Sequence, residues 1–388
     1  FKLMSSHASI TKPVIVQILP SLNHGGVERG TVEVADAVVK RGWKSVVISN
    51  GGLLSAKLQR IGSAVYKLPV HCKNPLLWPS IRRQVRRLLQ QEGADIVHLR
   101  SRAPAWISLP AADSLGISTV STIHSKFAPS NTFKKFYNAR MLKTDRVIAI
   151  SHYVESTIFE HYGKMNLAEK LCVVHRGVDL NMFDPAAVSQ QRIIAEADRL
   201  GVPEDKPIIM LPARPTAWKG HEILIQALAK LSQSDAVLIL IGVEDGPPAY
   251  ADKLRITALR CGLGGRVRIS TGSRDMPAAL MLADVVAMPS IEPEPFGRVA
   301  IEAQAMGRPV VAFRHGGAVE SIDEGQTGWL AKPNSVDSLV DALTAALMLG
   351  PRKRRSLAKN ARALMERQFS KDMMCEQTLD LYESLMKL

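Results

Sequence analysis

The stretch Met288-Pro-Ser-Ile-Glu-Pro-Glu-Pro-Phe-Gly-Arg-Val-Ala-Ile-Glu302 joins an apolar strand pattern to a helical pattern through a proline-rich turn. The prolines keep residues 290–295 out of a helix, so the strand ends where this stretch begins. A helix is expected to start near Phe296 and Gly297, and the backbone N–H groups of Phe296, Gly297 and Arg298 then lack helical partners. Such a helix N-terminus binds anions. The stretch therefore predicts an α/β fold with an anion site at the end of a strand.

Two glutamates flank the start of this helix. Glu294 comes just before it, and Glu302 lies nearly two turns inside it. Because a carboxylate accepts hydrogen bonds from two adjacent sugar hydroxyls, the pair is suited to hold two sugars. A capped helix in which Glu302 only forms a salt bridge is the alternative interpretation.

Short runs rich in Val, Ile or Leu alternate with helical patterns along the chain. Runs that are apolar on both faces are typical of parallel strands covered by helices on both sides, so we expect two doubly wound α/β domains. The expected parts are a domain at 1–184, a linker at 185–206, a second domain at 207–368, and a C-terminal helix at 369–388 that packs back on the first domain. The expected strands are Val14–Leu19, Ser45–Ser49, Asp95–Leu99, Ser118–Ile123, Arg146–Ile150, Leu171–His175, Pro207–Leu211, Ala236–Ile241, Arg266–Ser270, Asp284–Met288 and Pro309–Phe313.

The composition, 46% hydrophobic and 22% charged, is ordinary for a globular enzyme of 388 residues. No apolar run is long enough for a membrane-spanning helix, and no secretory signal is expected, with Met4 as the native start. The four cysteines are scattered, which predicts a reducing cytoplasm and no zinc site of the usual spacing.

The net charge of +14 is concentrated in one half of the chain. Residues 1–184 carry 25 Lys and Arg against 12 Asp and Glu, a net of +13, whereas residues 185–388 carry 25 against 24. A basic half suits an anionic membrane, an anionic glycolipid or nucleic acid. No aromatic-interleaved basic motif or helix-turn-helix signature is present, so we expect no nucleic-acid partner.

The spacing of the two glutamates carries a family resemblance. Seven residues separate Glu294 from Glu302, which resembles the E-x7-E element of retaining GT-B glycosyltransferases of family 4. Three more segments resemble this family in the same order: Asn23-His-Gly-Gly-Val-Glu28, Ala213-Arg-Pro-Thr-Ala-Trp-Lys-Gly220 and His315-Gly-Gly317. The basic first half is similar to bacterial enzymes that build the lipopolysaccharide core.

The resemblance implies two Rossmann-like domains facing a cleft, with a UDP-, GDP- or ADP-sugar as donor and no required cofactor or metal. It implies that Arg214 and Lys219 grip the donor diphosphate, that Glu294 holds the donor sugar, and that Glu302 holds the ribose. The configuration of the sugar would be retained without a covalent nucleophile, because the leaving diphosphate acts as base. The complete set of implied donor contacts is Gly25, Gly26, Arg214, Lys219, Gly242, Arg274, Asp275, Met276, Glu294, Pro295, Phe296, Gly297, Arg298 and Glu302.

The acceptor is expected on the first domain. His124 follows a strand and resembles the family histidine near the reacting centre, where it would act with Glu294, Arg214 and Lys219; a structural histidine is the alternative. The expected acceptor contacts are His98, Arg100, Arg102, His124 and Lys126.

The expected activity is transfer of a hexose to a glycolipid or oligosaccharide in the synthesis of lipopolysaccharide core or another cell-envelope glycan. The expected location is the cytoplasm, with peripheral contact to the inner membrane through the basic domain. A nucleotide-sugar epimerase of the same architecture and a basic nucleic-acid-binding protein are the alternatives. The sequence does not indicate the sugar, the base or the oligomeric state.

Overall fold

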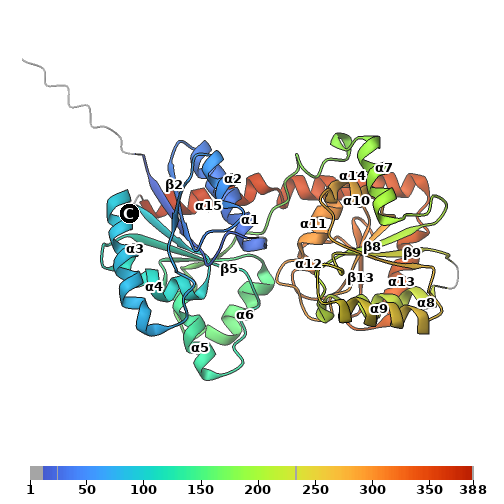
Figure 1. The fold of residues 1–388 in the computed structure, drawn as a ribbon, viewed down its shortest axis with the longest axis horizontal. Helices are drawn as coiled ribbons and strands as arrows, with labels where there is room; N and C mark the ends of the chain where they lie inside the picture. Colours follow the sequence, from blue (N-terminus) through green and yellow to red (C-terminus); the bar gives the residue numbers. More distant parts are fainter. Residues whose placement is uncertain (1–11, 24, 232–233, 387–388) are drawn as a thin grey trace, which may run out of the picture. The chain divides into compact units, whose positions relative to one another are not determined.

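A computed structural model describes residues 12–23, 25–231 and 234–386, so Met4 and His24 lie outside the described residues. The chain forms two compact units (Figure 1). The first comprises the chain up to Ile150, Val154–Val174 and the chain from Cys375 onward; the second comprises Ser151–Tyr153 and His175–Met374. The chain thus passes from the first unit to the second after Val174, whereas the boundary expected from the sequence pattern lies at residue 184.

The first unit is built on a seven-stranded parallel sheet in the order β3-β2-β1-β4-β5-β6-β7. The order reverses at β1, and β1 and β4 are neighbours, which is the arrangement of a doubly wound sheet. The strands are β1 (Val14–Ile18), β2 (Lys44–Ser49), β3 (Ala64–Lys67), β4 (Ile96–Leu99), β5 (Ser118–Ile123), β6 (Arg146–Ala149) and β7 (Leu171–Val173).

Helices cover both faces of this sheet, with α1, α2 and α15 on one side and α3 and α4 on the other (Figure 1). The helices are α1 (Gly26–Lys40), α2 (Ser55–Arg60), α3 (Trp78–Glu92), α4 (Arg102–Asp113), α5 (Thr132–Ala139), α6 (His152–Tyr162) and α15 (Lys371–Met386), with short 3₁₀ turns at Pro75–Leu77 and Arg140–Lys143.

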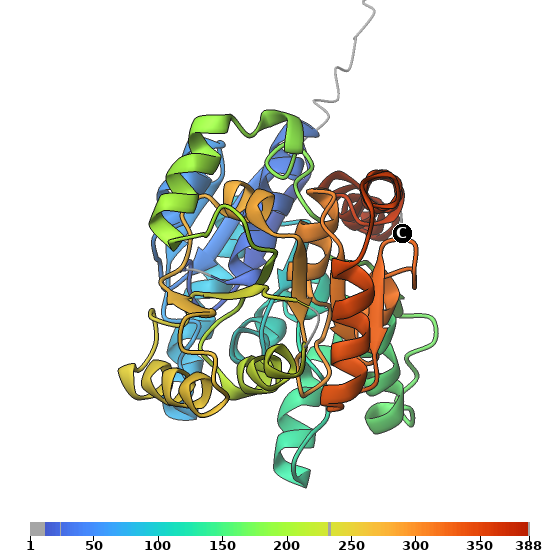
Figure 2. The same ribbon diagram turned by 90° about the vertical axis from the view of Figure 1, so that its right-hand side faces the viewer.

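The second unit has a six-stranded parallel sheet in the order β10-β9-β8-β11-β12-β13, which reverses at β8 in the same way. Helices α8, α9 and α13 lie on one side, and α7, α10, α11 and α14 lie on the other (Figure 1, Figure 2). The strands are β8 (Ile208–Pro212), β9 (Val237–Ile241), β10 (Val267–Ser270), β11 (Val285–Met288), β12 (Val310–Phe313) and β13 (Gly328–Ala331). The helices are α7 (Gln190–Leu200), α8 (His221–Lys230), α9 (Pro248–Arg260), α10 (Met276–Leu282), α11 (Arg298–Ala305), α12 (Ala318–Ser321), α13 (Val336–Leu347) and α14 (Pro351–Gln368), with 3₁₀ turns at Pro185–Ala187 and Ala217–Lys219.

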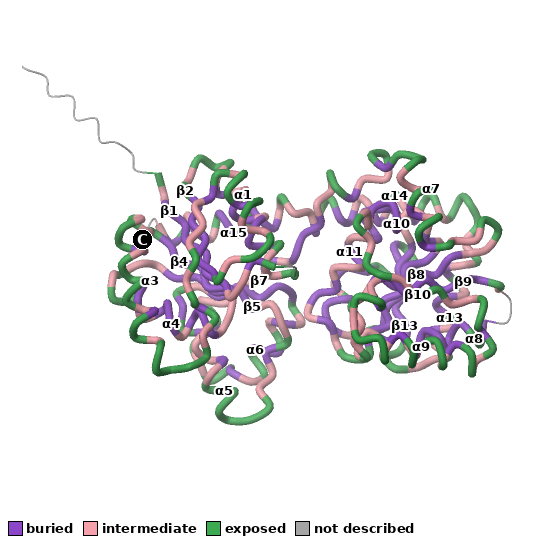
Figure 3. The backbone as a smooth tube through the Cα atoms, viewed as in Figure 1, coloured by how far each residue is buried: buried purple, intermediate pink, exposed green. Residues whose placement is uncertain are grey.

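The central strands of both sheets are buried along their whole length, while the outer faces of the helices are exposed (Figure 3). Strands buried on both faces need the continuous apolar runs that the sequence shows. The prediction of two doubly wound α/β domains is therefore confirmed. Among the described residues, no helix combines the length and the apolar character that crossing a bilayer requires.

Candidate functional site

Three of the sequence segments singled out above converge on Glu294 in the second unit. The Lys219 Nζ lies 2.6 Å from Glu294 Oε1, and Ser290 Oγ donates to the same oxygen at 2.5 Å. The backbone N–H of Gly317 donates to the Glu294 carbonyl oxygen at 2.8 Å. The Glu294 carboxylate is thus held in place by a lysine from the loop after β8 and a serine from the loop after β11.

A glycine makes the close approach of these two loops possible. Gly220 has a φ of +80°, and a Cβ added there would lie 1.9 Å from the carbonyl oxygen of Pro289. The backbone N–H of Ile291 donates to the Trp218 carbonyl at 2.8 Å, which joins the loops directly. The Trp218 ring also lies 4.1 Å from the Lys219 ammonium, a cation–π contact that orients the lysine.

The start of α11 is the expected helix N-terminus. Gly297 adopts a φ of +90°, and a Cβ there would meet the Met288 side chain at 2.9 Å. The Phe296 side chain is only 2% exposed and packs near the rings of His175 and Phe369. Phe296 can therefore contribute only backbone atoms to a ligand, and the prediction that it contacts a donor is limited to them.

The two cations predicted to bind phosphate differ in their present partners. Lys219 is paired with Glu294, whereas the exposed Arg214 guanidinium has no carboxylate partner among the residues that the structure describes. Glu302 lies 3.1 Å from Arg298 on the same helix, which is the salt bridge of the alternative interpretation. An anion bound by Lys219 would replace the Glu294 carboxylate as the partner of its ammonium.

The Asp275 side chain is already fully engaged. Its carboxylate accepts two hydrogen bonds of 2.7 Å from Arg192 and caps α10 at the N–H of Ala278. The Arg192 guanidinium holds the pKa of Asp275 below its ordinary value, with help from that cap. Arg192 was not predicted from the sequence, because it lies 83 residues away from its partner.

The structure also places the four other predicted donor contacts of this unit. Arg274 is exposed, and Met276 begins α10. Gly242 follows β9 with a φ of +92°, and the Pro295 carbonyl accepts a hydrogen bond from Ser151 Oγ at 2.5 Å.

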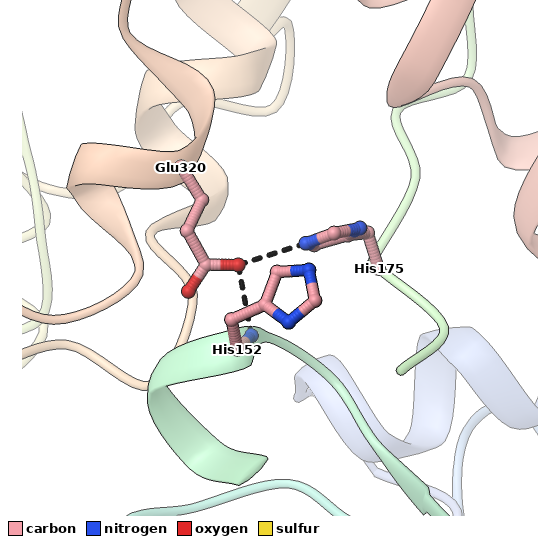
Figure 4. A group of neighbouring side chains, drawn as sticks. All are labelled: His152, His175 and Glu320. Atoms are coloured by element: carbon pink, nitrogen blue, oxygen red, sulfur yellow. Dashed lines mark hydrogen bonds and ion pairs between the residues drawn. The ribbon is translucent and has the colours of Figure 1, made fainter. Parts of the chain in front are cut away.

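A second cluster of the same unit joins His152, His175 and Glu320 (Figure 4). His175 Nε2 lies 2.8 Å from Glu320 Oε2, and the two carboxylate oxygens accept the backbone N–H groups of His152 and Tyr153. Burial alone would raise the pKa of Glu320, but these hydrogen bonds outweigh it and lower the pKa. One nitrogen of each histidine and one carboxylate oxygen of Glu320 all lie within 4.8 Å of one another, so the two imidazoles and the carboxylate could hold a metal ion. The hydrogen bonds to protein donors account for the cluster as it stands.

The first unit contains a separate cavity of about 210 Å³ at the ends of β4 and β5. It brings together three of the predicted acceptor residues, Arg100, Arg102 and His124, with Thr122 and Ser125. Arg102 lies over the Phe127 ring at 5.2 Å and donates to Ser125 Oγ at 3.3 Å. Burial lowers the pKa of both guanidiniums. The cavity is therefore lined by cations that gain from an anionic ligand.

Arg100 is the more deeply buried of these cations, at 4% exposure. Its guanidinium donates to the neutral side-chain oxygen of Gln17, at 3.1 Å from Nε and 2.5 Å from Nη2. Gln17 in turn donates to the Thr31 carbonyl. A buried charge is costly unless an opposite charge or strong acceptors compensate it, so a neutral partner leaves Arg100 suited to bind an anion.

His98 is placed differently from the expectation. It is fully buried, and its two ring nitrogens are occupied by the Tyr382 hydroxyl at 2.5 Å and by Thr122 Oγ1 at 2.7 Å. The prediction that His98 contacts an acceptor is therefore corrected: its side chain joins β4 to α15 and does not reach the cavity. Lys126 is exposed and does not line the cavity either.

The predicted glycine pair lies at the start of α1, in the first unit. Gly26 begins the helix and Gly25 precedes it, where a Cβ would meet the Glu28 carboxylate at 2.2 Å. A side chain at position 25 would require the flexible end of the Glu28 side chain to move.

Both halves of the chain match known glycosyltransferase families. Residues 193–364 match the family profile described as Glycosyl transferases group 1, and residues 24–182 match Glycosyltransferase Family 4. A D-inositol 3-phosphate glycosyltransferase of Xylanimonas cellulosilytica is 32% identical over 311 residues, which cover 76% of this chain and 72% of that protein. The chain belongs to the group 1 (family 4) glycosyltransferases.

Further similarities extend this result. A GDP-mannose-dependent α-(1-6)-phosphatidylinositol monomannoside mannosyltransferase of Mycobacterium tuberculosis is 30% identical over 74% of this chain and 75% of its own. The crystal structure of a glycosyltransferase from Rickettsia africae superimposes with a TM-score of 0.90 at 33% identity, covering 97% of this chain and 99% of that one. HepE from Anabaena, solved in complex with UDP-glucose, has the same fold with a TM-score of 0.82 at 24% identity, covering 96% and 99%.

These findings confirm the family resemblance and the GT-B fold predicted from the sequence. The chain is therefore a glycosyltransferase by family membership.

Proposed function

We propose that this enzyme transfers a sugar from a nucleoside diphosphate sugar to a phosphorylated acceptor, with retention of configuration and without a metal ion. The observation that carries the proposal is the convergence of Lys219, Ser290 and the 315–317 loop on Glu294. A lysine beside a helix N-terminus is suited to a diphosphate, and a carboxylate next to it is suited to sugar hydroxyls.

In this proposal the second unit binds the donor. The diphosphate takes the place of Glu294 as the partner of Lys219 and also engages the exposed Arg214, with the N–H groups at 297 and 298 as further donors. Glu294 then turns its free acceptor capacity to the donor sugar, and Glu302 binds the ribose. Cations at the leaving group stabilise the charge that develops as the bond breaks, which is worth several kcal/mol in such sites.

Retention follows if both bonds lie on one face of the sugar. The bond from the anomeric carbon to the diphosphate oxygen breaks, the acceptor oxygen bonds to that carbon on the same face, and the acceptor proton passes to the leaving diphosphate. No protein nucleophile is needed, so the two glutamates hold hydroxyl groups. His124, which lines the cavity of the first unit, is the proposed hydrogen-bonding partner of the acceptor hydroxyl.

The first unit binds the acceptor in this proposal. The cavity lined by Arg100 and Arg102 favours a phosphate, because a buried guanidinium with a neutral partner is stabilised by an anion. Two relatives are named for phosphorylated inositol acceptors, which supports an acceptor of this class. Phosphorylated lipopolysaccharide core is a further acceptor of the same chemistry, as expected for a cytoplasmic enzyme that works at the inner face of a membrane.

A donor panel followed by an acceptor panel tests the proposal. Thermal shifts with UDP-, GDP- and ADP-sugars should identify one donor, since a ligand that binds only the folded state raises the melting temperature. Transfer from that donor is then measured to inositol 3-phosphate, phosphatidylinositol mannoside and phosphorylated core oligosaccharide, with the product anomer determined by NMR. Equal or faster transfer to the dephosphorylated form of each acceptor, an inverted product, or loss of activity on chelation would each contradict part of the proposal.

A further inference from the structure

The exposed phenylalanines of this protein gather at one place. Five of the eight phenylalanines in the described residues are buried, with at most 2% exposure. The other three are Phe133, Phe136 and Phe159, exposed by 77%, 61% and 41%. Phe133 and Phe136 lie one turn apart on α5, and Phe136 and Phe159 line the same groove. We call these three residues the phenylalanine surface.

The groove beside them lies between α5 and the end of α6. It has a volume of about 510 Å³ and is lined by apolar side chains that include Phe136, Phe159, Tyr162 and Met165. The Lys135 ammonium lies 5.7 Å from the Tyr162 ring, so the two helices are in contact across it. Figure 1 shows α5 and α6 side by side at one end of the first unit, and residues 132–136 of α5 are exposed, whereas Asn138 is buried (Figure 3).

The charge around this surface is mostly positive. No Asp or Glu occurs between Asp113 and Asp145, while this interval carries five Lys and Arg. Lys134 and Lys135 are exposed on α5 itself, between the two phenylalanines. Lys164 lines the groove, where Glu160 is the only acidic side chain among the described lining residues.

We propose that the phenylalanine surface inserts into an anionic lipid bilayer and that Lys134, Lys135 and Lys164 bind the lipid headgroups. The proposal rests on the proposed lipid-linked, phosphorylated acceptor and names the part of the protein that reaches the membrane. Exposed aromatic side chains among cationic ones are typical of helices that lie in the interface, because the rings enter the acyl boundary while the ammonium groups stay with the phosphates.

A lipid surface fits these observations better than a protein partner does. The core of a protein interface is usually depleted of lysine, whereas here two lysines stand between the exposed rings. A basic protein half with a net charge of +13 also has complementary charge for an anionic membrane.

Binding of the full chain to vesicles tests the inference. Partition coefficients are measured by flotation with vesicles of phosphatidylcholine alone and of phosphatidylcholine with phosphatidylglycerol. The variant F133A/F136A is expected to lower the partition coefficient about tenfold or more. The variant K134Q/K135Q is expected to lower it about 25-fold on anionic vesicles, from about fivefold per lysine, with little change on neutral ones.

Two matched controls distinguish binding through the phenylalanine surface from nonspecific hydrophobic adsorption and from an effect of net charge. I256A/L259A removes two exposed apolar side chains at the same helical spacing on α9, where they are 49% and 65% exposed. K353Q/R355Q removes two exposed charges from α14. Both controls should bind vesicles like the unaltered protein, within about twofold.

Equal losses in a surface variant and its control would overturn the inference, as would unchanged binding of F133A/F136A. If the unaltered protein does not bind anionic vesicles but forms a complex with a purified protein partner through Phe133, the inference is overturned in favour of a protein interface. Donor-induced thermal shifts are recorded for every variant. If no nucleotide sugar binds while vesicle binding follows the expected pattern, the proposed activity fails and the membrane surface stands.

Discussion

Substitutions at Lys219 and at Glu294 should have opposite effects on the affinity for a nucleoside diphosphate. Their charged atoms lie 2.6 Å apart, and the two side chains are only 12% and 9% exposed. In the ligand-free protein each charge satisfies the other. A diphosphate replaces the carboxylate as the partner of Lys219, so the lysine contributes to nucleotide binding while the glutamate competes with it.

The expected magnitudes follow from this exchange. Lys219→Ala removes one charge-assisted hydrogen bond to phosphate, worth about 1.5–3 kcal/mol, so the Kd for UDP or GDP should rise about 10- to 150-fold. Glu294→Gln keeps the shape and removes the competing charge, so the free nucleoside diphosphate should bind at least as tightly as before. The nucleotide sugar should lose affinity in this variant, because a carboxylate contact to the sugar is gone.

Isothermal titration calorimetry with the nucleotide and the nucleotide sugar measures both effects. Lys230→Ala is the matched control, since its ammonium lies 2.7 Å from Asp337 but the two side chains are 57% and 82% exposed. Exposed pairs contribute little, so this variant should bind nucleotides normally. A folded Lys219→Ala protein with an unchanged Kd, or a Glu294→Gln protein that loses nucleotide affinity as strongly as Lys219→Ala, would refute the reasoning.

Three further substitutions test the structure elsewhere. Tyr382→Phe leaves a buried imidazole nitrogen without its partner and should lower the free energy of unfolding by about 1–3 kcal/mol in urea titrations; no change would show that water replaces the hydroxyl. Because hydrogen bonds lower the folded-state pKa of Glu320 below its ordinary value of 4.5, its stabilisation is complete above about pH 4.5 and is lost as the pH falls through the folded-state value. The difference in unfolding free energy between the unaltered protein and Glu320→Gln should therefore shrink on acidification below pH 4.5, and a constant difference would contradict this. Gly220→Ala meets a backbone oxygen at 1.9 Å and should cost clearly more stability than Gly262→Ala, whose φ of +72° is similar but whose surroundings are open; equal thermal shifts would show that the loop adapts.

The central strands were predictable because burial on both faces imposes a continuous apolar run. Ser118–Ile123 was predicted with the bounds that β5 has. The strands that sequence reasoning missed, β3 and β13, are four residues long and lie at the edges of their sheets. β3 is only partly buried, so its apolar pattern is weak, whereas β13 is mostly buried but begins with glycine and ends with alanine, which are residue types depleted in strands.

The site was predictable where neighbouring residues in the sequence determine the backbone conformation. The prolines of residues 289–295 and Gly297 fix the end of a strand and the start of a helix, so Glu294 could be placed at that junction. Its partners could not be derived in the same way, because Lys219 lies 75 residues away. The burial of His98 was hidden for the same reason, since Tyr382, which occupies its ring nitrogen, lies 284 residues further along the chain.

That last contact has a consequence for biosynthesis. The first unit is discontinuous: most of it has been synthesised by residue 174, yet the segment that carries Tyr382 is synthesised after the whole second unit. At about 5–20 residues per second, the synthesis of roughly 200 residues takes on the order of 10–40 s. For that time His98 on β4 lacks its contact with Tyr382. During that interval the surface that α15 will cover is open to solvent and to chaperones. The nascent first unit should therefore reach its native resistance to proteases only after the segment that carries Tyr382 has emerged from the ribosome.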